Sequence, residues 1–278
     1  MQELKSDVLF TIKNLECSYN GSDPVLVINS IIFYKGKITA VLGASGAGKS
    51  TILETLGLMN KTFINGSDIV FHTSSGQSVS YRDLWKKDQY KELETIRNQH
   101  FSFVFQETNL MPNFTAYENV CLGQMFQGKG YSDSFEKARE TMERLGMADI
   151  DDQKKTNELS GGQKQRLAFI RAVTPEYSVL FGDEPTGNLD EKTSEDLMNI
   201  LRGDVQQKQV SAIIVTHNIN LAVRFADVIM IITKSGETGE LLPENVFSRF
   251  LNDDGSCIWK NHQDQELHNV EKMIKNLL

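Results

Sequence analysis

The stretch that decides the fold reads Lys37-Ile38-Thr39-Ala40-Val41-Leu42-Gly43-Ala44-Ser45-Gly46-Ala47-Gly48-Lys49-Ser50-Thr51. Its apolar first part predicts a buried strand, and the residues from Lys49 to Leu58 predict a helix that ends near Gly57. The glycine-rich part between them, Gly43 to Thr51, fits the phosphate-loop pattern G-x-x-x-x-G-K-[ST]. Such a loop points several backbone N–H groups at one phosphate, and the following helix adds its positive N-terminal end. The sequence therefore predicts a site for nucleotide phosphates.

Two polar side chains of this loop have expected roles. Lys49 is expected to reach the β- and γ-phosphates, and the hydroxyl of Ser50 is expected to bind Mg²⁺. A second candidate for the metal is Asp183, which ends the apolar strand at Val179–Phe181. Ligands of α/β proteins bind at the carboxyl ends of such strands, so Asp183 is expected to hold Mg²⁺ through water. Glu184 comes next and can point elsewhere, because side chains alternate along a strand.

A second glycine-rich element lies further along the chain, at Leu159-Ser160-Gly161-Gly162-Gln163-Lys164-Gln165-Arg166. Ser160 with Gln163 forms a possible capping box, which predicts that a helix begins there. The start of a helix offers free N–H donors and a partial positive charge to an anion. The phosphate loop is already expected to bind the phosphate of a nucleotide on the same chain. This second element is therefore a separate candidate for binding an anion.

The order of phosphate loop, second glycine-rich element and acidic strand end resembles the ATPase subunit of ATP-binding cassette (ABC) systems. The resemblance runs from about Val8 to Gly236. It implies the ABC ATPase fold of the P-loop NTPases, an α/β fold with a mostly parallel core sheet, an N-terminal antiparallel β subdomain and an α-helical signature subdomain at about 107–170. We expect the ABC ATP-binding domain to cover 1–240. Residues 241–278 would form a C-terminal extension with a short amphipathic helix, in which Leu267, Val270, Ile274 and Leu277 follow helical spacing.

The resemblance also implies ATP and Mg²⁺ as ligands and gives roles to single residues. The ATP-binding residues of the phosphate loop would be Gly43, Ala44, Ser45, Gly46, Ala47, Gly48, Lys49, Ser50 and Thr51. Glu184 would polarise the attacking water, Gln106 would contact Mg²⁺ and this water, and His217 would touch the γ-phosphate. Tyr19 lies where the family places an aromatic ring that stacks on adenine.

A second copy of the chain would complete the site. By the resemblance, Ser160, Gly161, Gly162 and Gln163 close on ATP held by the other subunit. Asp190, in Asn188-Leu189-Asp190, matches a loop that crosses the interface. The resemblance therefore implies a homodimer formed around ATP.

Short stretches predict the remaining elements. Expected strands are the runs within Val8–Tyr34, Phe101–Phe105, Ala212–Val215 and Val228–Ile232, and expected helices are Tyr81–Asn98 and an interrupted segment at Thr115–Gly146. The segment Gly66–Ser80 is polar and predicts turns. Strands that alternate with helices favour a mostly parallel sheet.

Composition narrows the possible partners. A net charge of −8 argues against a nucleic-acid partner, which would need a basic face. The widely spaced Cys17, Cys121 and Cys257 suit a reducing compartment and show no metal-binding spacing. We see no apolar signal segment at the N-terminus and no apolar run of about 20 residues, so a role at a membrane would need a separate partner.

Two stretches resemble one group of bacterial ABC ATPases, those of lipoprotein release, macrolide export and antimicrobial-peptide resistance, to which the cell-division ATPase is related. They are Glu107–Val120 and Glu184–Asp190. The resemblance implies a cytoplasmic subunit, peripheral on the inner face of the cell membrane and docked on a membrane permease. The chain departs from this group in a long spacing between Lys49 and Gln106, with the extra residues expected between Asn65 and Tyr90. It departs also in the tail after Gly239 and in Asn218, where the family often has Asp.

Two other functions stay open on the sequence. One is a soluble ABC ATPase that acts on nucleic acid or ribosomes, although such relatives usually carry two cassettes, coiled coils or zinc modules. The other is an ATP-sensing interaction protein without turnover, against which Glu184 and His217 argue.

Overall fold

The computed structural model describes residues 7–64, 66–86, 90–252 and 256–278. Its centre is a parallel sheet with the strand order β9-β3-β8-β7-β6. These strands are β3 (Ile38–Gly43), β6 (Phe101–Val104), β7 (Val179–Asp183), β8 (Ser211–Val215) and β9 (Val228–Ser235). All five residues of β8 are buried, as expected for a parallel strand covered on both faces.

The strand register brings the functional segments to one edge of this sheet. Gly43 pairs with Ile232, and Asp183 pairs with Val215. Because β3, β7 and β8 are parallel, the segments that follow them leave the sheet at the same edge. That edge therefore carries the phosphate loop, the acidic pair after β7 and the histidine after β8.

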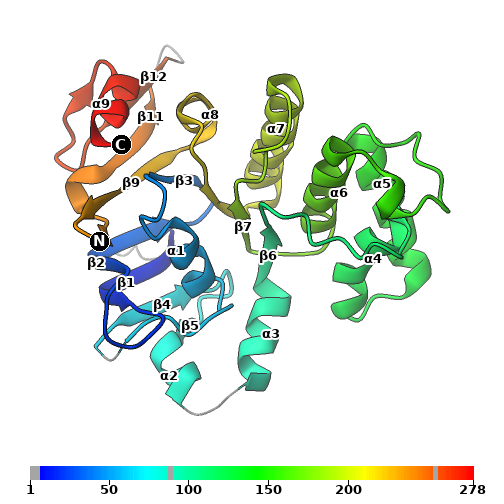
Figure 1. The fold of residues 1–278 in the computed structure, drawn as a ribbon, viewed down its shortest axis with the longest axis horizontal. Coiled ribbons are helices and arrows are strands. Elements are labelled where there is room, and N and C mark those ends of the chain that lie inside the picture. The colour runs from blue at the N-terminus through cyan, green and yellow to red at the C-terminus, as the bar shows by residue number, and fades with distance from the viewer. Residues whose placement is uncertain (1–6, 65, 87–89, 253–255) are drawn as a thin grey trace.

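An antiparallel sheet lies beside the core sheet, with α1 (Lys49–Leu56) between the two (Figure 1). It consists of β1 (Val8–Cys17), β2 (Leu26–Tyr34), β4 (Asp68–His72) and β5 (Ser78–Ser80). The short β10 (Thr238–Glu240) pairs with β2 and with the end of β9, and so joins the two sheets. One hydrophobic core fills the space between them and includes Ile52 and Leu56 of α1.

The segment Gly66–Ser80, expected to be polar and rich in turns, also contains the strands β4 and β5. Ile69 and Phe71 are buried between less buried neighbours, a period of two that the surrounding Ser, Thr and Gly residues hide. The helical segment after it divides into α2 (Tyr81–Lys86) and α3 (Tyr90–His100). The extra residues expected between Asn65 and Tyr90 fall in these elements, apart from 65 and 87–89, which lie outside the described residues.

The helical part of the molecule packs on the opposite face of the core sheet (Figure 1). It contains α4 (Ala116–Phe126), α5 (Tyr131–Arg144), the short η2 (Thr156–Glu158) and α6 (Gly161–Val173), and α7 (Glu191–Lys208) follows β7. Capping boxes begin α4 at Thr115 and α6 at Ser160. In each, the cap side chain and the third helical residue satisfy one another's backbone N–H groups, which fixes where the helix begins.

Residues after 241 continue the core sheet. Strand β11 (Val246–Leu251) pairs antiparallel with β9, and it is followed by β12 (Cys257–Lys260) and β13 (Glu266–Leu267). The last helix, α9 (Val270–Leu277), packs against α8 (Ile219–Phe225) and buries Val270 and Ile274 in the same hydrophobic core as Phe247 and Trp259. The short η3 (Pro243–Asn245) precedes β11. Leu267 lies in β13 rather than in the helix, because Asn269 caps the helix start. The division of the chain at residue 240 stays a prediction.

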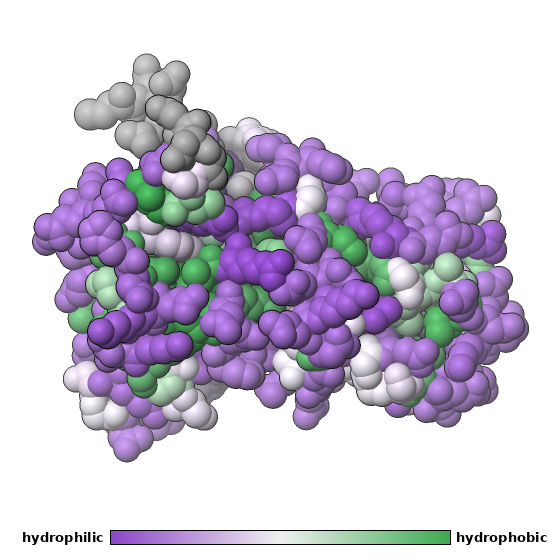
Figure 2. All heavy atoms as spheres, turned by 90° about the horizontal axis from the view of Figure 1, so that it is seen from above, coloured by the Kyte–Doolittle hydropathy of each residue, from purple (hydrophilic) through white to green (hydrophobic). Residues whose placement is uncertain are grey.

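The surface is mostly hydrophilic in the view of Figure 2. Figure 2 shows a face on which hydrophilic side chains predominate and hydrophobic ones form patches between them. Within the described part of the chain, no helix has both the length and the apolar character needed to cross a membrane.

Candidate nucleotide site

A cavity of about 610 Å³ opens at the edge of the core sheet where the phosphate loop lies. Most of the predicted site residues line it, together with Val25 and Val215, which the sequence did not single out: Tyr19, Gly43, Ser45, Gly46, Gly48, Lys49, Ser50, Thr51, Gln106, Asp183, Glu184 and His217. Ala47 is fully buried beneath the loop. The fold thus brings residues from five separate segments of the chain to one opening.

The start of α1 is shaped for a phosphate. Gly48 occupies the position before the helix with a φ of 88°, a left-handed conformation that glycine adopts readily. No side chain caps this helix start. The first N–H groups of α1 are therefore left without a side-chain acceptor and can bind an anion.

Lys49 points its ammonium group back into the loop. Its Nζ donates hydrogen bonds to the carbonyl oxygens of Gly43, at 2.8 Å, and Ala44, at 2.9 Å. Burial lowers the pKa of Lys49, whereas the nearby carboxylates of Glu184 and Asp183 act to raise it. A bound phosphate could replace the two carbonyls as the partner of this cation, so the loop holds the ammonium group ready for exchange.

The residues at the metal position fit Mg²⁺. The Ser50 hydroxyl donates a hydrogen bond of 2.8 Å to Oδ2 of Asp183, and Gln106 lines the same cavity. All three offer oxygen atoms, and Mg²⁺ is typically bound by one or two carboxylates, water and substrate phosphates rather than by an all-protein cage. The described residues contain no cluster of three or more His, Cys, Asp or Glu that could hold a metal.

Glu184 and His217 form a pair at the far side of the cavity. Oε1 of Glu184 lies 2.8 Å from Nδ1 of His217, and the carboxylate is 13% exposed whereas the imidazole is 76% exposed. Glu184 has a φ of 48°, which is uncommon for a residue other than glycine and turns its side chain out of the regular alternation of β7. Its N–H donates to the carbonyl of Val215, which ties this turn to β8.

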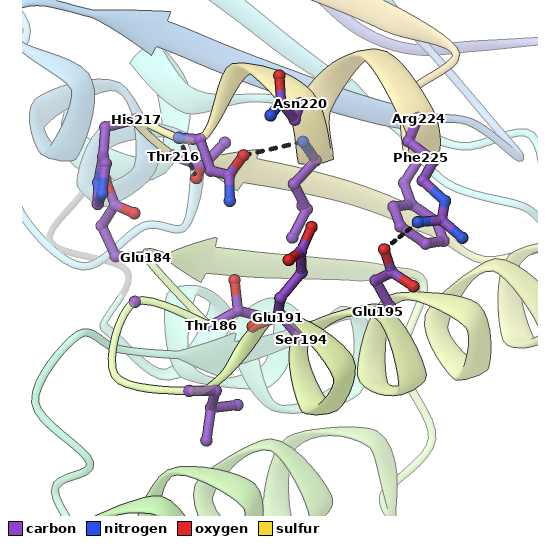
Figure 3. Close-up of a pocket in the computed structure, with 14 residues that line it drawn as sticks. Glu184, Thr186, Glu191, Ser194, Glu195, Thr216, His217, Asn220, Arg224 and Phe225 are labelled. Atoms are coloured by element: carbon purple, nitrogen blue, oxygen red, sulfur yellow. Dashed lines mark hydrogen bonds and ion pairs between the residues drawn. The ribbon is translucent and has the colours of Figure 1, made fainter.

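The same pair borders a second cavity, of about 350 Å³, between the N-terminal part of α7 and the length of α8 (Figure 3). Figure 3 shows Glu184 and His217 facing each other at one end of it, and Glu195 bonded to Arg224 at the other. Asn218 begins α8 here, and its Oδ1 accepts a hydrogen bond of 3.0 Å from the N–H of Leu221. Asn caps a helix as well as Asp does, so this departure from the family pattern leaves the helix start intact.

Tyr19 lies at the opposite end of the nucleotide cavity. Its ring is 60% exposed, and its hydroxyl is within hydrogen-bond distance of Thr51 Oγ1, at 3.1 Å, and Glu54 Oε2, at 3.0 Å. These two contacts hold the hydroxyl end of Tyr19, while most of the residue remains exposed beside the cavity. Such a ring is suited to stacking on a nucleotide base.

The second glycine-rich element does not reach this cavity. Ser160 Oγ accepts a hydrogen bond from Gln163 N, and Gln163 Oε1 accepts one from Ser160 N. Asp190 caps α7 by accepting from Thr193, which also receives a hydrogen bond from Arg166 of α6. The starts of α6 and α7 are thus joined to each other but, within the described residues, not to the phosphate loop.

Sequence reasoning missed Arg171, which holds the segment after Gln106. From α6 its guanidinium group donates to the carbonyl oxygens of Thr108, at 2.8 Å, and Asn109, at 2.7 Å. Burial lowers the pKa of Arg171. An arginine on a mostly apolar helix is the only sequence signal for this contact, and it does not identify the partner.

Comparisons with known proteins agree with this geometry. The profile of the ABC transporter family matches residues 28–187. The lipoprotein-releasing system ATP-binding protein LolD of Idiomarina loihiensis is 37% identical over 78% of this chain and 91% of its own length. The macrolide export ATP-binding/permease protein MacB of Vibrio parahaemolyticus is 35% identical over 84% of this chain and 34% of its own length.

A solved structure shows the same fold. It is the dimeric post-hydrolysis state of the ATP-binding cassette MJ0796, from Methanocaldococcus jannaschii, bound to ADP and Pi. It superimposes with a TM-score of 0.70 at 30% identity and covers 84% of this chain and 96% of that one. The expected fold class is confirmed, and the chain belongs to the ABC transporter family as an ATP-binding ABC ATPase.

Proposed function

We propose that this chain is the ATP-hydrolysing subunit of a membrane assembly. It dimerises around ATP and Mg²⁺ and drives a separate permease, bound in the cytoplasm to the inner face of the cell membrane. The observation that carries the proposal is the gathering of Lys49, the Ser50–Asp183 pair and the Glu184–His217 pair at one cavity. The names of the LolD and MacB relatives support lipoprotein release or export as the process that is driven.

Charge and position do most of the chemical work. Phosphoryl transfer to water depends on orienting the reactants and neutralising the phosphate charge, with little covalent chemistry by the protein. Lys49 and the open N–H groups of α1 bind the phosphate chain from the loop side. Ser50 and Asp183 would hold Mg²⁺, with Gln106 lining the same cavity, and the ion would supply further positive charge beside the phosphates. Tyr19 holds the base at the other end.

Glu184 is the proposed general base. Its Oε1, which lies beside Nδ1 of His217 in the structure, accepts a proton from the attacking water. His217 is exposed enough to turn toward the γ-phosphate, which leaves Glu184 free to bind this water. The strained turn at Glu184 aims the carboxylate at the cavity before any substrate binds.

A second copy completes the site. Ser160 and the glycines after it begin a helix outside the cavity, so they can meet only a phosphate that is held by another chain. Asp190 lies on the same face through the contact of Thr193 with Arg166. Closure of two copies head to tail would place each Ser160 on the ATP of the other copy. It would also exclude bulk solvent from both sites, leaving the attacking water in place.

The permease is proposed to dock in a groove beside α4. A cavity of about 410 Å³ lies there, lined by Phe101, Phe103, Phe126, Met59, Glu94, Arg97 and Asn98. Phe126 is 71% exposed, which is unusual for so large an apolar side chain and typical of an interaction site. Phe103 belongs to β6, which leads directly to Gln106, so a partner in this groove would sense the state of the nucleotide site.

Co-purification tests this proposal. The tagged chain, isolated from detergent-solubilised membranes, is expected to bring with it a multi-spanning protein with a large extracytoplasmic domain. Phe126→Asp should lose this partner and keep ATP binding. The matched control is Leu251→Asp, since Leu251 is 75% exposed on β11, away from the groove. Recovery of the chain only from the soluble fraction would contradict the proposal.

The alternative of an ATPase acting on nucleic acid or ribosomes is not favoured, because the matching relatives are transporter cassettes. Salt-sensitive binding to DNA or RNA would revive it.

A further inference from the structure

The hairpin of β9 and β10 packs closely against the outside of the phosphate loop. Lys234 and Gly239 face each other across this hairpin. A side chain at Gly239 has no room, because its Cβ would lie 2.0 Å from the carbonyl oxygen of Ala47. The hairpin also holds the turn after Tyr19, since Thr238 Oγ1 donates to the carbonyl of Pro24 at 2.8 Å and Gly239 N donates to Val25 at 3.0 Å. Its position relative to the nucleotide cavity is therefore fixed on two sides.

Lys234 extends from this hairpin over the tip of the phosphate loop. A methyl group built on Gly46 would lie 3.3 Å from Nζ of Lys234, so the ammonium group rests against the loop backbone. The side chain is exposed, and no carboxylate of the described residues forms an ion pair with it. Lys234 also acts to lower the pKa of Lys49, which places the two cations within each other's field.

Two ammonium groups held at one loop repel each other, and the cost falls when an anion lies between or beside them. Asp183 and Glu184 face Lys49 from the sheet side of the cavity. The tip of the loop near Gly46, in contrast, carries Lys234 without a carboxylate in ion-pair distance. Lys234 is not among the residues that line the nucleotide cavity, but it lies beside Gly46, which does. The anion expected at this loop is the phosphate chain of the nucleotide.

We propose that Lys234 is a second phosphate-binding cation, which contacts the nucleotide phosphates from outside the loop while Lys49 contacts them from inside. The proposal rests on the proposed function of this site and adds a residue to it. Because Lys234 is exposed, its contribution is smaller than that of Lys49 and depends on salt, which screens surface charges. Its role is in affinity, and it takes no part in the attack of water.

ADP binding isolates this contact. ADP carries two of the phosphates and, unlike ATP, offers no γ-phosphate around which a second copy would close. Lys234→Met should weaken ADP binding in calorimetry by roughly two- to fivefold at low salt, as expected for one exposed charge, and should flatten the dependence of affinity on salt. Lys234→Arg should retain most of the affinity. Lys13→Met removes the same charge from an exposed position on β1 and should change nothing.

Three other outcomes would contradict a phosphate-binding role for Lys234. Equal ADP affinity in Lys234→Met and the parent would remove Lys234 from the phosphate site. A loss restricted to ATP-driven dimerisation would assign its ammonium group to a carboxylate of the second copy. A fall in melting temperature, with no rescue by Lys234→Arg, would make it a structural support of the hairpin. Failure of the parent chain to bind ADP would instead contradict the proposed function itself.

Discussion

The starts of α1 and α6 are both glycine-rich, but only the start of α6 has a side-chain cap. Before α1 stands Gly48, in a left-handed conformation and with no side-chain cap. Before α6 stands Ser160, whose hydroxyl and whose partner Gln163 form a complete capping box. The first helix start keeps its N–H groups open, whereas the second satisfies two of its donors internally.

This difference explains how one chain can hold two anion sites without competition between them. A helix start without a cap costs stability, and this stability is recovered when a phosphate binds. We therefore expect the start of α1 to be the primary phosphate site. A capped start is stable alone and retains only Gly161 N, Gly162 N and the Ser160 hydroxyl as donors. Because it lies outside the nucleotide cavity of its own chain, we propose that it adds to a phosphate that another chain holds.

Glu184→Gln should have the largest effect on the rate of ATP hydrolysis. It stops turnover without changing the start of α1 or of α6, so the binding roles of the two helix starts can be measured separately from hydrolysis. Loss of a general base lowers the rate by on the order of a hundred- to ten-thousandfold. ATP binding should be kept, because the phosphate contacts of Lys49 and α1 remain. Phosphate release measures the rate, and Glu176→Gln, at an exposed position, serves as the control. Unchanged turnover would remove Glu184 from its role.

Lys49→Ala should have the next largest effect, at the open helix start alone. It removes hydrogen bonds between a cation and phosphate, a loss of about 3 kcal/mol or roughly a hundredfold in affinity. Calorimetry with ATP measures it, and Lys13→Ala controls for the change of net charge. Retained affinity would mean that α1 is not the primary phosphate site.

A smaller effect is expected from Tyr19→Ala, which leaves both helix starts intact and removes the proposed platform for the base. Base–aromatic stacking contributes about 1–3 kcal/mol, so the affinity for ATP should fall roughly tenfold. Tyr19→Phe keeps the ring and loses only the hydroxyl contacts with Thr51 and Glu54, and should bind nearly as the parent does. Equal losses in both variants would assign the effect to these hydroxyl contacts instead.

The sequence predicted the parallel core because its strands are continuous apolar runs next to recognisable loops. The expectation for Lys49 and Asp183 came from the phosphate-loop pattern and the strand end, whereas His217 was expected only from the family resemblance; the parallel strands place all three at one edge. The strands β4 and β5 were not predicted because their few apolar residues lie in a segment rich in Ser, Thr and Gly. Only Ile69 and Phe71 of β4 are buried. Their pairing depends on β1, a partner far away in the sequence.

Contacts to the backbone of remote segments could not be predicted either. Arg171 holds carbonyl groups of Thr108 and Asn109, and Lys234 rests on Gly46, but a carbonyl or a glycine leaves no pattern in the sequence. The strands β11 to β13 were missed because residues 246–267 mix polar and apolar side chains without a regular period. Their place is set by the free edge of β9.

The central claim is that the capped start of α6 serves ATP held by another copy. Its most direct test is the sedimentation of Glu184→Gln with and without Ser160→Arg, in the presence of MgATP. We expect Glu184→Gln to form a dimer with ATP, and the double variant to stay monomeric while each monomer binds ATP as before. A double variant that still dimerises, or that loses ATP binding as Lys49→Ala does, would contradict the claim.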